Sequence, residues 1–398
     1  MKYDLIVVGG GIVGLATSLK IKQANPDLKL LILEKEKDIA IHQTGHNSGV
    51  IHSGLYYKPG SLKATNCIRG YTELVQFCQE ESIPYELCGK IVVATAPEEL
   101  PIMDGLYERG VQNGLTDLKK LSAEELKEYE PHVNGLGGIL VPQTGIVNYK
   151  VVAQRYLDKI KNLGGEIVFG EKVIGVHRKG RSLELVTDNT TYQTNLMVNC
   201  AGLYSDKLAK MTLPHVNFKI IPFRGEYYQL SKEKEHLVKN LIYPVPDPNF
   251  PFLGVHFTRM IGGGIEAGPN AVLAFRREGY TKTAFHLGEL GETLGWPGFQ
   301  KVAYKYWRTG FGEMYRSWSK AAFTKALQKL MPEITENDLI PGGAGVRAQA
   351  CDKNGGLIDD FLILEGEGVV NVCNAPSPAA TSSLSIGQTV ADLALKRL

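Results

Sequence analysis

The chain has little cysteine and no excess of either charge. Its six cysteines stand at 67, 78, 88, 200, 351 and 373, and no two have the CxxC spacing of metal-binding or redox-active pairs. The 44 Lys and Arg residues nearly balance the 42 Asp and Glu residues, for a formal net charge of +2. The first feature excludes a disulfide scaffold and an iron–sulfur cluster, and we expect no metal. The second argues against a nucleic-acid partner.

Long hydrophobic runs are also missing. Residues 368–391 carry no charge, but they contain Pro376, Pro378 and many hydroxyl side chains. A membrane-spanning helix needs about 20 mostly apolar residues, so this stretch does not qualify. The N-terminal MKYDLIVVGGGIVG runs into glycines without a small-residue cleavage site, and we expect no signal peptide. These absences predict a cytoplasmic protein, or one that is peripheral on the inner face of the cytoplasmic membrane.

Glycine is abundant, and its most informative cluster follows the first apolar run. Residues 4–8 (DLIVV) predict a buried strand, and the following GGGIVG satisfies GxGxxG through Gly9, Gly11 and Gly14 before a helical pattern begins. A turn of this kind places a helix N-terminus against a pyrophosphate. A second buried strand ends at Glu34, whose carboxylate can accept hydrogen bonds from a ribose. The unit predicts a dinucleotide site.

The sequence after this unit favours FAD over NAD. An NAD-dependent dehydrogenase usually continues with regular βα repeats, whereas residues 41–57 read IHQTGHNSGVIHSGLYY. This small and polar segment can bring its backbone close to a large planar ring system. A later predicted strand ends in Cys200, Ala201 and Gly202, which again permit close approach.

Predicted strands and small-residue turns of the dinucleotide-binding type occur at the start, in the middle and at the end of the 398 residues. We therefore predict an α/β fold with a discontinuous, Rossmann-like FAD-binding domain made of residues 1–80, 145–215 and 340–398. A substrate domain with an antiparallel sheet and helices is expected to be inserted as residues 81–144 and 216–339.

A family resemblance extends over the whole chain. It is carried by the Gly9–Gly14 turn, Glu34, HNSGVIHSGLYY, VNCAGLYSD, GVHFT, GPNAVLAFRREGY, GVRAQ and NAPSPAATSSLSIG, in that order. These motifs resemble the L-2-hydroxyglutarate dehydrogenase/oxidase family, within the D-amino-acid-oxidase-like FAD oxidoreductases. The resemblance implies that fold and the oxidation of L-2-hydroxyglutarate to 2-oxoglutarate by hydride transfer to flavin. Mitochondrial members carry a presequence that is not visible here, which favours a bacterial-type form or a processed mitochondrial one.

The resemblance also implies the cofactor contacts. The ADP half of FAD is assigned to Gly9, Gly11, Ile12, Val13, Gly14, Glu34 and Lys35. The pyrophosphate, ribityl chain and flavin edge are assigned to Thr44, Gly45, His46, Asn47, Ser48 and Gly49. Val173 is expected beside the adenine and Gly202 where a strand end passes the cofactor. The flavin is expected to face the segment before the last helix, with Asn374, Ser377, Ala379, Ala380 and Thr381.

Oxidation of a 2-hydroxy acid requires a cation for the carboxylate and a base for the hydroxyl. Arg347, flanked by small residues in GAGVRA, is the predicted carboxylate clamp because a guanidinium binds carboxylate in a bidentate way. His256 in GVHFT is the leading candidate for the base, and His52 in GVIHSG is the alternative. Either histidine can instead be an ordinary core residue.

A C5 diacid needs a second cation or hydroxyl group for its distal carboxylate. The candidate cations are Lys63, Arg69, Arg259 and Arg276, and the candidate hydroxyl donors are Tyr56, Tyr57 and Tyr243. The sequence does not choose among them.

The electron acceptor is predicted to be a quinone or dioxygen, because no second glycine turn for NAD is present. Residues 301–329 hold seven Lys and Arg residues against Glu313, interleaved with aromatic residues. A basic, aromatic helix of this kind can lie on an anionic membrane and approach its quinone. The other interpretations are a helix pair with its aromatics turned inward, and a surface for an acidic partner.

Two further functions fit parts of the sequence. The same fold can act on glycerol 3-phosphate or an amino acid, although a phosphate calls for more clustered cations. A non-catalytic FAD-binding protein is the third hypothesis. Bleaching of the flavin by a substrate would distinguish this non-catalytic hypothesis from the two hypotheses in which the protein is an enzyme.

Overall fold

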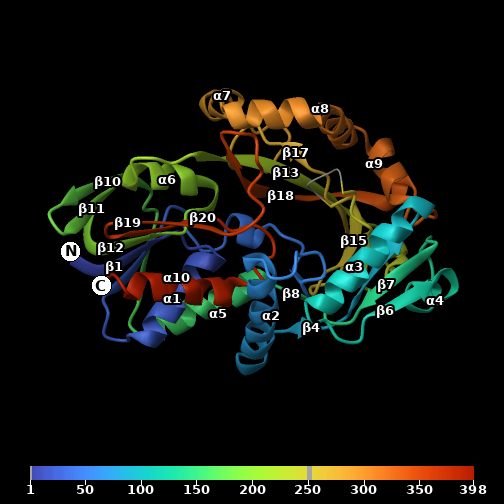
Figure 1. The fold of residues 1–398 in the computed structure, drawn as a ribbon, viewed down its shortest axis with the longest axis horizontal. Helices are drawn as coiled ribbons and strands as arrows, with labels where there is room; N and C mark the ends of the chain where they lie inside the picture. The colour runs from blue at the N-terminus through green and yellow to red at the C-terminus, as the bar shows by residue number, and fades with distance from the viewer. Residues whose placement is uncertain (1, 249–252) are drawn as a thin grey trace.

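A computed structural model describes residues 2–248 and 253–398, and two large sheets dominate it (Figure 1). The first sheet has eight strands, with β10–β11–β12–β1–β2–β9 as its main order; β20 also pairs with β12, and β19 with β20. These strands come from three separate stretches of the chain. They are β1 (Lys2–Val8), β2 (Leu30–Glu34), β9 (Glu166–Phe169), β10 (Val173–Lys179), β11 (Ser182–Thr187), β12 (Thr191–Asn199), β19 (Leu362–Gly366) and β20 (Val369–Asn374).

Both faces of this sheet are buried, as the alternating side chains of β1 show. Leu5 and Val7 belong to one core cluster and Ile6 and Val8 to another, as expected of parallel strands covered on both sides. The first cluster includes residues of α1 (Ile12–Ala24), α2 (Leu62–Glu80), α5 (Tyr149–Asn162) and α10 (Ser383–Leu395). The second is covered by β10, β11 and α6 (Ser205–Thr212). Figure 1 shows α1, α5 and α10 side by side beneath the sheet.

The second sheet has nine strands and is antiparallel except where β5 pairs with β14. Its main order is β17–β13–β16–β15–β14–β5–β7–β6, and β18 pairs with β13. The strands are β5 (Lys90–Ala94), β6 (Lys119–Ser122), β7 (Gly137–Val141), β13 (Phe218–Leu230), β14 (Leu241–Pro244), β15 (His256–Arg259), β16 (Ile265–Gly268), β17 (Val272–Leu273) and β18 (Leu339–Asp352). A small third sheet joins β3 (Val50–Ile51), β8 (Gly145–Val147) and β4 (Tyr85–Glu86).

One predicted boundary needs correction. Residues 340–352 were expected in the cofactor domain, but they form most of β18, which pairs with β13 from Phe218 opposite Asp352 to Leu230 opposite Leu339. The glycine-rich sequence PGGAG predicts a loop here, and only the long partner strand makes it extended. The chain returns to the first sheet at β19.

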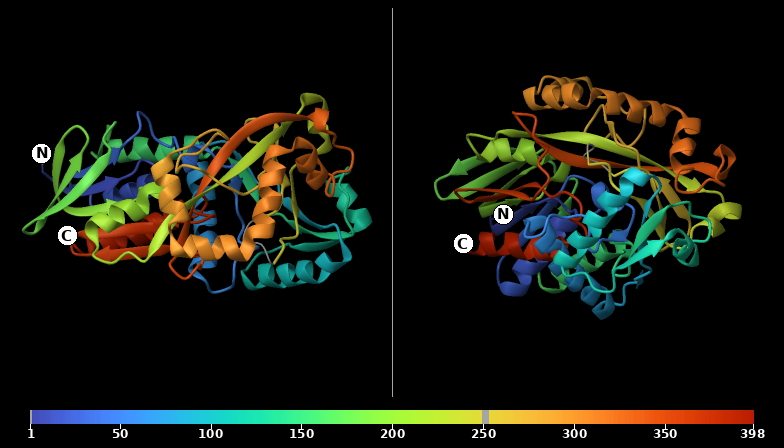
Figure 2. Two further views of the ribbon diagram at one scale, coloured as in Figure 1. Left: turned by 90° about the horizontal axis from the view of Figure 1, so that it is seen from above. Right: turned by 45° about the vertical axis from the view of Figure 1, so that its right-hand side comes forward.

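The remaining helices surround the second sheet. They are α3 (Leu100–Gln112), α4 (Ala123–Tyr129), α7 (Leu287–Leu294), α8 (Pro297–Trp318) and α9 (Lys320–Leu327). Short 3₁₀ turns are η1 (Gln43–Gly45), η2 (Pro97–Glu99), η3 (Gly202–Tyr204), η4 (Lys232–Leu237) and η5 (Glu336–Asp338). Both chain ends lie at the end of the molecule formed by the first sheet (Figure 2). Within the described part of the chain, none of the helices has the length and apolar character needed to cross a membrane.

Five of the seven aromatic side chains of α8 are exposed, which is contrary to the expectation of a helix pair with its aromatics inside. Tyr304 is 86% exposed, Phe311 71% and Trp318 69%, while the helix buries Phe299 and Val302 instead.

A buried ion pair fastens the two parts together. The guanidinium of Arg277, which is 3% exposed, donates to both carboxylate oxygens of Asp206 in α6, at 2.6 and 2.9 Å. The same carboxylate accepts a hydrogen bond from the Ile220 amide of β13 at 3.2 Å. Asp206 therefore connects the helix of the first part to the strand and loop of the second.

We predict that Arg277→Met lowers the free energy of unfolding by about 3–5 kcal/mol, because it leaves a buried carboxylate without its cation. The double variant Asp206→Asn/Arg277→Met should recover much of this loss. Urea denaturation of the four proteins measures both effects. A double variant as unstable as the sum of the two single ones would show that the pair does not act as a unit.

Candidate active site

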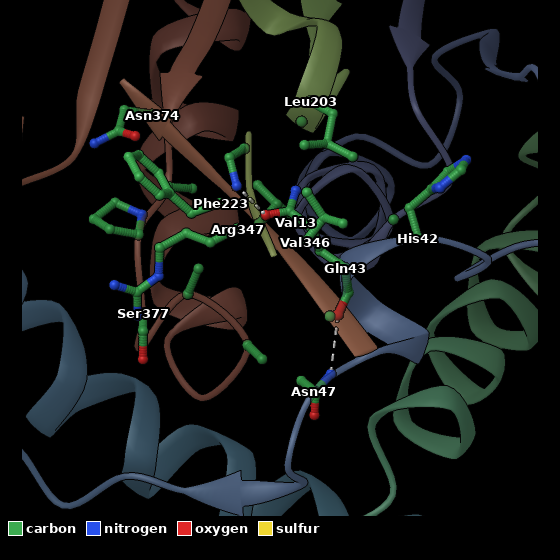
Figure 3. Close-up of a pocket in the computed structure, with 18 of the residues that line it drawn as sticks. Val13, His42, Gln43, Asn47, Leu203, Phe223, Val346, Arg347, Asn374 and Ser377 are labelled. Carbon is green, nitrogen blue, oxygen red and sulfur yellow. Dashed lines mark hydrogen bonds between the residues drawn. The ribbon is translucent and has the colours of Figure 1, made fainter. Parts of the chain in front are cut away.

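A cavity of about 1820 Å³ is lined by residues of both parts. Pockets for small ligands usually measure about 300–1,000 Å³, so this space is large enough for a dinucleotide together with a small substrate. Its wall includes the β1–α1 turn, the ends of β2 and β12, the loop after β2, β18 and residues 375–380. Figure 3 shows Val13, Gln43, Arg347 and Ser377 around this space.

The glycines of the first turn have different roles. A Cβ on Gly9 would lie 2.4 Å from the Cys200 carbonyl oxygen, and its φ of +117° is unfavourable for other residues. A Cβ on Gly14 would lie 2.1 Å from the Gly9 carbonyl oxygen. Both glycines are therefore required by the packing of β1, α1 and β12. A Cβ on Gly11 would meet only Thr44 Oγ1, at 3.5 Å. The packing of the core therefore does not require glycine here, and the missing side chain leaves space in the cavity.

This turn fits the phosphates of a dinucleotide. Gly11 is the N-cap of α1 and offers no side-chain cap, so amide groups at the helix start remain available to an anion. The exception is Ile12, whose amide donates to Thr44 Oγ1 at 3.0 Å. Ile12 and Val13 line the cavity, whereas Gly14 lies behind it.

Glu34 lies at the end of β2 and faces the cavity. Its carboxylate accepts hydrogen bonds from the amides of Gly10 at 2.6 Å and Glu36 at 2.9 Å, and these fix its orientation. Lone pairs remain on each oxygen for ribose hydroxyls. Lys35 also lines the cavity, but its ammonium pairs with Glu278 at 2.5 Å and with Glu36.

The loop after β2 contributes four of its six predicted residues to the wall: Thr44, His46, Asn47 and Ser48. The other two are glycines required by the protein itself. A Cβ on Gly45 would lie 2.3 Å from the Ala40 carbonyl oxygen, and one on Gly49 would lie 2.7 Å from that of Val147. The His46 ring packs against the Tyr280 ring, with ring centroids 4.4 Å apart.

The remaining predicted cofactor residues come from three other elements. Those that line the cavity are Val173, Gly202, Asn374, Ser377, Ala379 and Ala380. Thr381 does not line it. Its hydroxyl hydrogen-bonds with Tyr149 Oη at 2.8 Å and accepts from the His52 amide at 3.1 Å, so it supports the loop that carries His52. Helix α10 itself begins two residues later, at Ser383.

His256 and Tyr243 lie together on the wall of the cavity. Their ring centroids are 4.0 Å apart, and His256 is 6% exposed. His256 Nδ1 lies 2.9 Å from the Gly254 carbonyl oxygen, which can only accept, so Nδ1 carries the proton and Nε2 keeps its lone pair. Burial lowers the pKa of His256 to about 4, with a smaller contribution from Lys90. The imidazole is therefore neutral at pH 7 and can accept a proton.

His52 and Arg347 line the same cavity. Burial, assisted by the charge of Lys90, lowers the pKa of His52 to about 3. Arg347 projects from β18 beside Phe223 (Figure 3), and desolvation by the surrounding protein lowers its pKa although Tyr227 and Tyr57 act in the opposite direction. Tyr57 also lines the cavity and hydrogen-bonds with Ser377.

Three of the four candidate substrate cations do not line the cavity. The guanidinium of Arg259 pairs with Glu86 at 2.6 Å, and that of Arg276 lies 3.7 Å from Glu278. The prediction of Arg259 and Arg276 as substrate residues is therefore wrong, because each already has a carboxylate partner and neither lines the space. Arg69 likewise pairs with Glu73 at 2.7 Å on α2. Lys63 does line the cavity, paired with Asp359 at 2.8 Å.

Two residues were not predicted: Gln43, which lines the cavity, and Lys90, which does not line it but contacts two tyrosines that do. Gln43 Oε1 accepts a hydrogen bond from the Ala348 amide at 3.1 Å and so joins the cofactor loop to the strand of Arg347. Lys90 lies 4.5 Å from the Tyr56 ring centroid and 5.0 Å from that of Tyr243. The sequence does carry a signal for Lys90, since a lysine at the first position of an otherwise apolar strand is unusual.

Comparison with known proteins agrees with this geometry. The family model of FAD-dependent oxidoreductases matches residues 4–393. The chain is 63% identical to an L-2-hydroxyglutarate dehydrogenase from Indibacter alkaliphilus over 398 residues, covering all of both chains. It is 44% identical to the mitochondrial L-2-hydroxyglutarate dehydrogenase of Homo sapiens, covering 98% of this chain and 88% of that one.

Solved structures show the same fold at low identity. An L-α-glycerophosphate oxidase from Mycoplasma pneumoniae with FAD bound superposes with a TM-score of 0.81 at 22% identity, covering 99% of this chain and 95% of the other. A glycine oxidase from Bacillus cereus gives a TM-score of 0.71 at 16% identity, covering 100% and 96%. The fold is thus the D-amino-acid-oxidase-like α/β fold predicted from the sequence. The chain belongs to the FAD-dependent oxidoreductase family and, within it, to the L-2-hydroxyglutarate dehydrogenases.

Proposed function

We propose that the protein oxidises L-2-hydroxyglutarate to 2-oxoglutarate and passes the electrons to a membrane quinone or to dioxygen. The observation that carries this proposal is that a glycine-turn dinucleotide site, Arg347 and the neutral His256 line one cavity. The relatives named above are dehydrogenases of this hydroxy acid, which supports the choice of substrate.

The chain's own groups supply binding and proton transfer. Arg347 receives the C1 carboxylate, since a guanidinium offers two parallel N–H donors. His256 Nε2 accepts the hydroxyl proton, because Gly254 holds the proton of the ring on Nδ1. Tyr57, hydrogen-bonded to Ser377, borders the same space. Bound FAD supplies the acceptor for the hydrogen and electron pair that leave C2.

Anaerobic mixing of the yellow holoenzyme with L- and D-2-hydroxyglutarate tests the reaction. We expect the oxidised flavin band to bleach with the L isomer only, with one equivalent of 2-oxoglutarate formed per flavin. Bleaching by glycerol 3-phosphate or an amino acid, and by neither hydroxyglutarate isomer, would refute the substrate. A flavin that no candidate bleaches would favour a non-catalytic FAD-binding protein.

The pH dependence of flavin reduction tests the assignment of His256 as the base. Because its pKa is lowered to about 4, His256 stays neutral well below the usual histidine value of about 6.5. We predict that the rate of flavin reduction falls only as the pH drops through about 4. His256→Gln should slow the step by about 10²–10⁴-fold in stopped-flow measurements. The comparison is His52→Gln: if that variant loses the rate and His256→Gln does not, the roles are reversed.

For the acceptor, the outward face of α8 supports a membrane quinone. Tyr304, Trp307, Phe311, Tyr315 and Trp318 are exposed and alternate with lysines and arginines on the same helix. Aromatic rings favour the membrane–water interface, and basic side chains are attracted to anionic lipids. Helix α7 lines the cavity through Gly288, Glu289 and Glu292 and leads into α8. A bacterial-type protein would then lie on the inner face of the cytoplasmic membrane.

We predict that Phe311→Ser/Trp318→Ser reduces binding to phosphatidylglycerol vesicles by about 10-fold or more, since each ring loses an apolar contact of order 1 kcal/mol or more. Reduction of a soluble dye should be unchanged, because α8 lies outside the site. Leu136→Ser, at an exposed apolar residue elsewhere, is the control. Co-sedimentation measures binding, and equal binding by all three proteins would refute the membrane contact.

A further inference from the structure

Lys90 is a buried cation beside the cavity. It is the first residue of β5, in which all five residues are buried, and is 2% exposed. Alternation along the strand puts Lys90 on the same face as Val92 and Ala94, which pack in one cluster with Tyr243. The Tyr243 ring in turn packs against the His256 ring. Lys90 therefore lies on the side of the second sheet that faces the cavity.

The Lys90 ammonium has no anionic partner among the described residues. Its contacts are the rings of Tyr56 and Tyr243, 4.5 and 5.0 Å from the nitrogen to the ring centroids, and both tyrosines line the cavity. Rings stabilise a cation only weakly compared with the cost of removing a lone ammonium from water. Burial accordingly lowers the pKa of Lys90 to about 7. Such a group is stabilised most by an anion that arrives with a ligand.

Two cations that line the cavity near Lys90 already have partners. Lys63 pairs with Asp359 at 2.8 Å, and Arg109 donates to the Tyr56 carbonyl oxygen at 3.0 Å. Arg347 is the clamp assigned to the C1 carboxylate. Lys90 is distinguished from these residues by burial without a counterion.

A hydrogen-bond donor accompanies this ammonium. The hydroxyl of Tyr56 is buried and has no hydrogen-bond partner among the described residues. A buried phenol usually finds a partner, and burial raises the pKa of Tyr56 so that it remains a donor. The Lys90 ammonium does not itself line the cavity, but it lies 4.5 Å from the ring centroid of the lining residue Tyr56, so the ammonium and the phenolic donor can together receive a carboxylate.

Lys90 and Arg347 act on the same histidine. Both charges contribute to lowering the pKa of His52, so both lie within electrostatic range of its ring. A linear C5 diacid carries a carboxylate at each end and its hydroxyl next to one of them. The two cations can therefore serve its two ends, with the histidines beside the carbon chain.

We propose that Lys90, together with the Tyr56 hydroxyl, binds the distal carboxylate of the substrate and selects a dicarboxylic 2-hydroxy acid over a monocarboxylic one. This inference rests on the proposed function and adds the residue that determines its specificity.

The test compares two substrates on the holoenzyme. L-2-hydroxyglutarate has the second carboxylate, and L-2-hydroxybutyrate lacks it. We expect Lys90→Met to lower kcat/KM for the diacid by about 10²-fold and to change kcat/KM for the monoacid by only a few-fold. Lys90→Arg should restore part of the loss. Lys22→Met is the matched control, because Lys22 is also 2% exposed but is bound by the carbonyl oxygens of Pro26 and Leu28, and it should leave the ratio unchanged.

The outcomes separate the two levels of inference. A wild-type enzyme that L-2-hydroxyglutarate does not reduce would refute the proposed function itself. An active wild type, with Lys90→Met losing both substrates equally, would overturn the role of Lys90 alone. If Lys90→Met does not fold, Tyr56→Phe decides: weaker inhibition by glutarate with unchanged inhibition by butyrate supports the receptor, and unchanged inhibition by both refutes it.

Discussion

The contact between the first glycine turn and the end of β12 is the constraint on which the cofactor half depends. Gly9 approaches the Cys200 carbonyl so closely that no side chain fits, and Gly14 lies equally close to Gly9. Because of this packing, α1 starts directly at the edge where β1, β2 and β12 end. The open start of the helix, the carboxylate of Glu34 and the small residues after β12 thus share one cavity wall.

The positions of features that depend on residues close together in the sequence were predicted correctly. The turn, Glu34 and the small-residue end of β12 are local patterns, and their positions follow from the geometry of a βαβ unit. Gly45 and Gly49 cannot be distinguished from Gly11 in the sequence. In the structure, however, they are glycines because backbone carbonyl groups of the protein lie too close for a side chain. Spacing alone does not tell whether a glycine makes room for a ligand or for the chain.

Features that depend on distant partners were not predictable in the same way. The glycine-rich start of β18 is extended only because β13 lies beside it. Arg259 and Arg276 resemble substrate cations until their carboxylate partners are known. The outward direction of the α8 aromatics depends on which face the second sheet covers. The sequence did not single out Lys90, because a lysine stands out only when it is buried without a carboxylate nearby. Whether a carboxylate is nearby depends on residues that are distant in the sequence.

The link between the cofactor loop and β18 has a thermodynamic consequence. Gln43 holds the Ala348 amide, and a Cβ on Gly345 would lie only 2.6 Å from the His46 carbonyl oxygen, so loop and strand fit each other at two points. Any free energy that the dinucleotide contributes to ordering this loop therefore also orders the strand that carries Arg347. We therefore expect affinity for the cofactor and affinity for a carboxylate to be linked, in which case each ligand changes the binding of the other by the same factor.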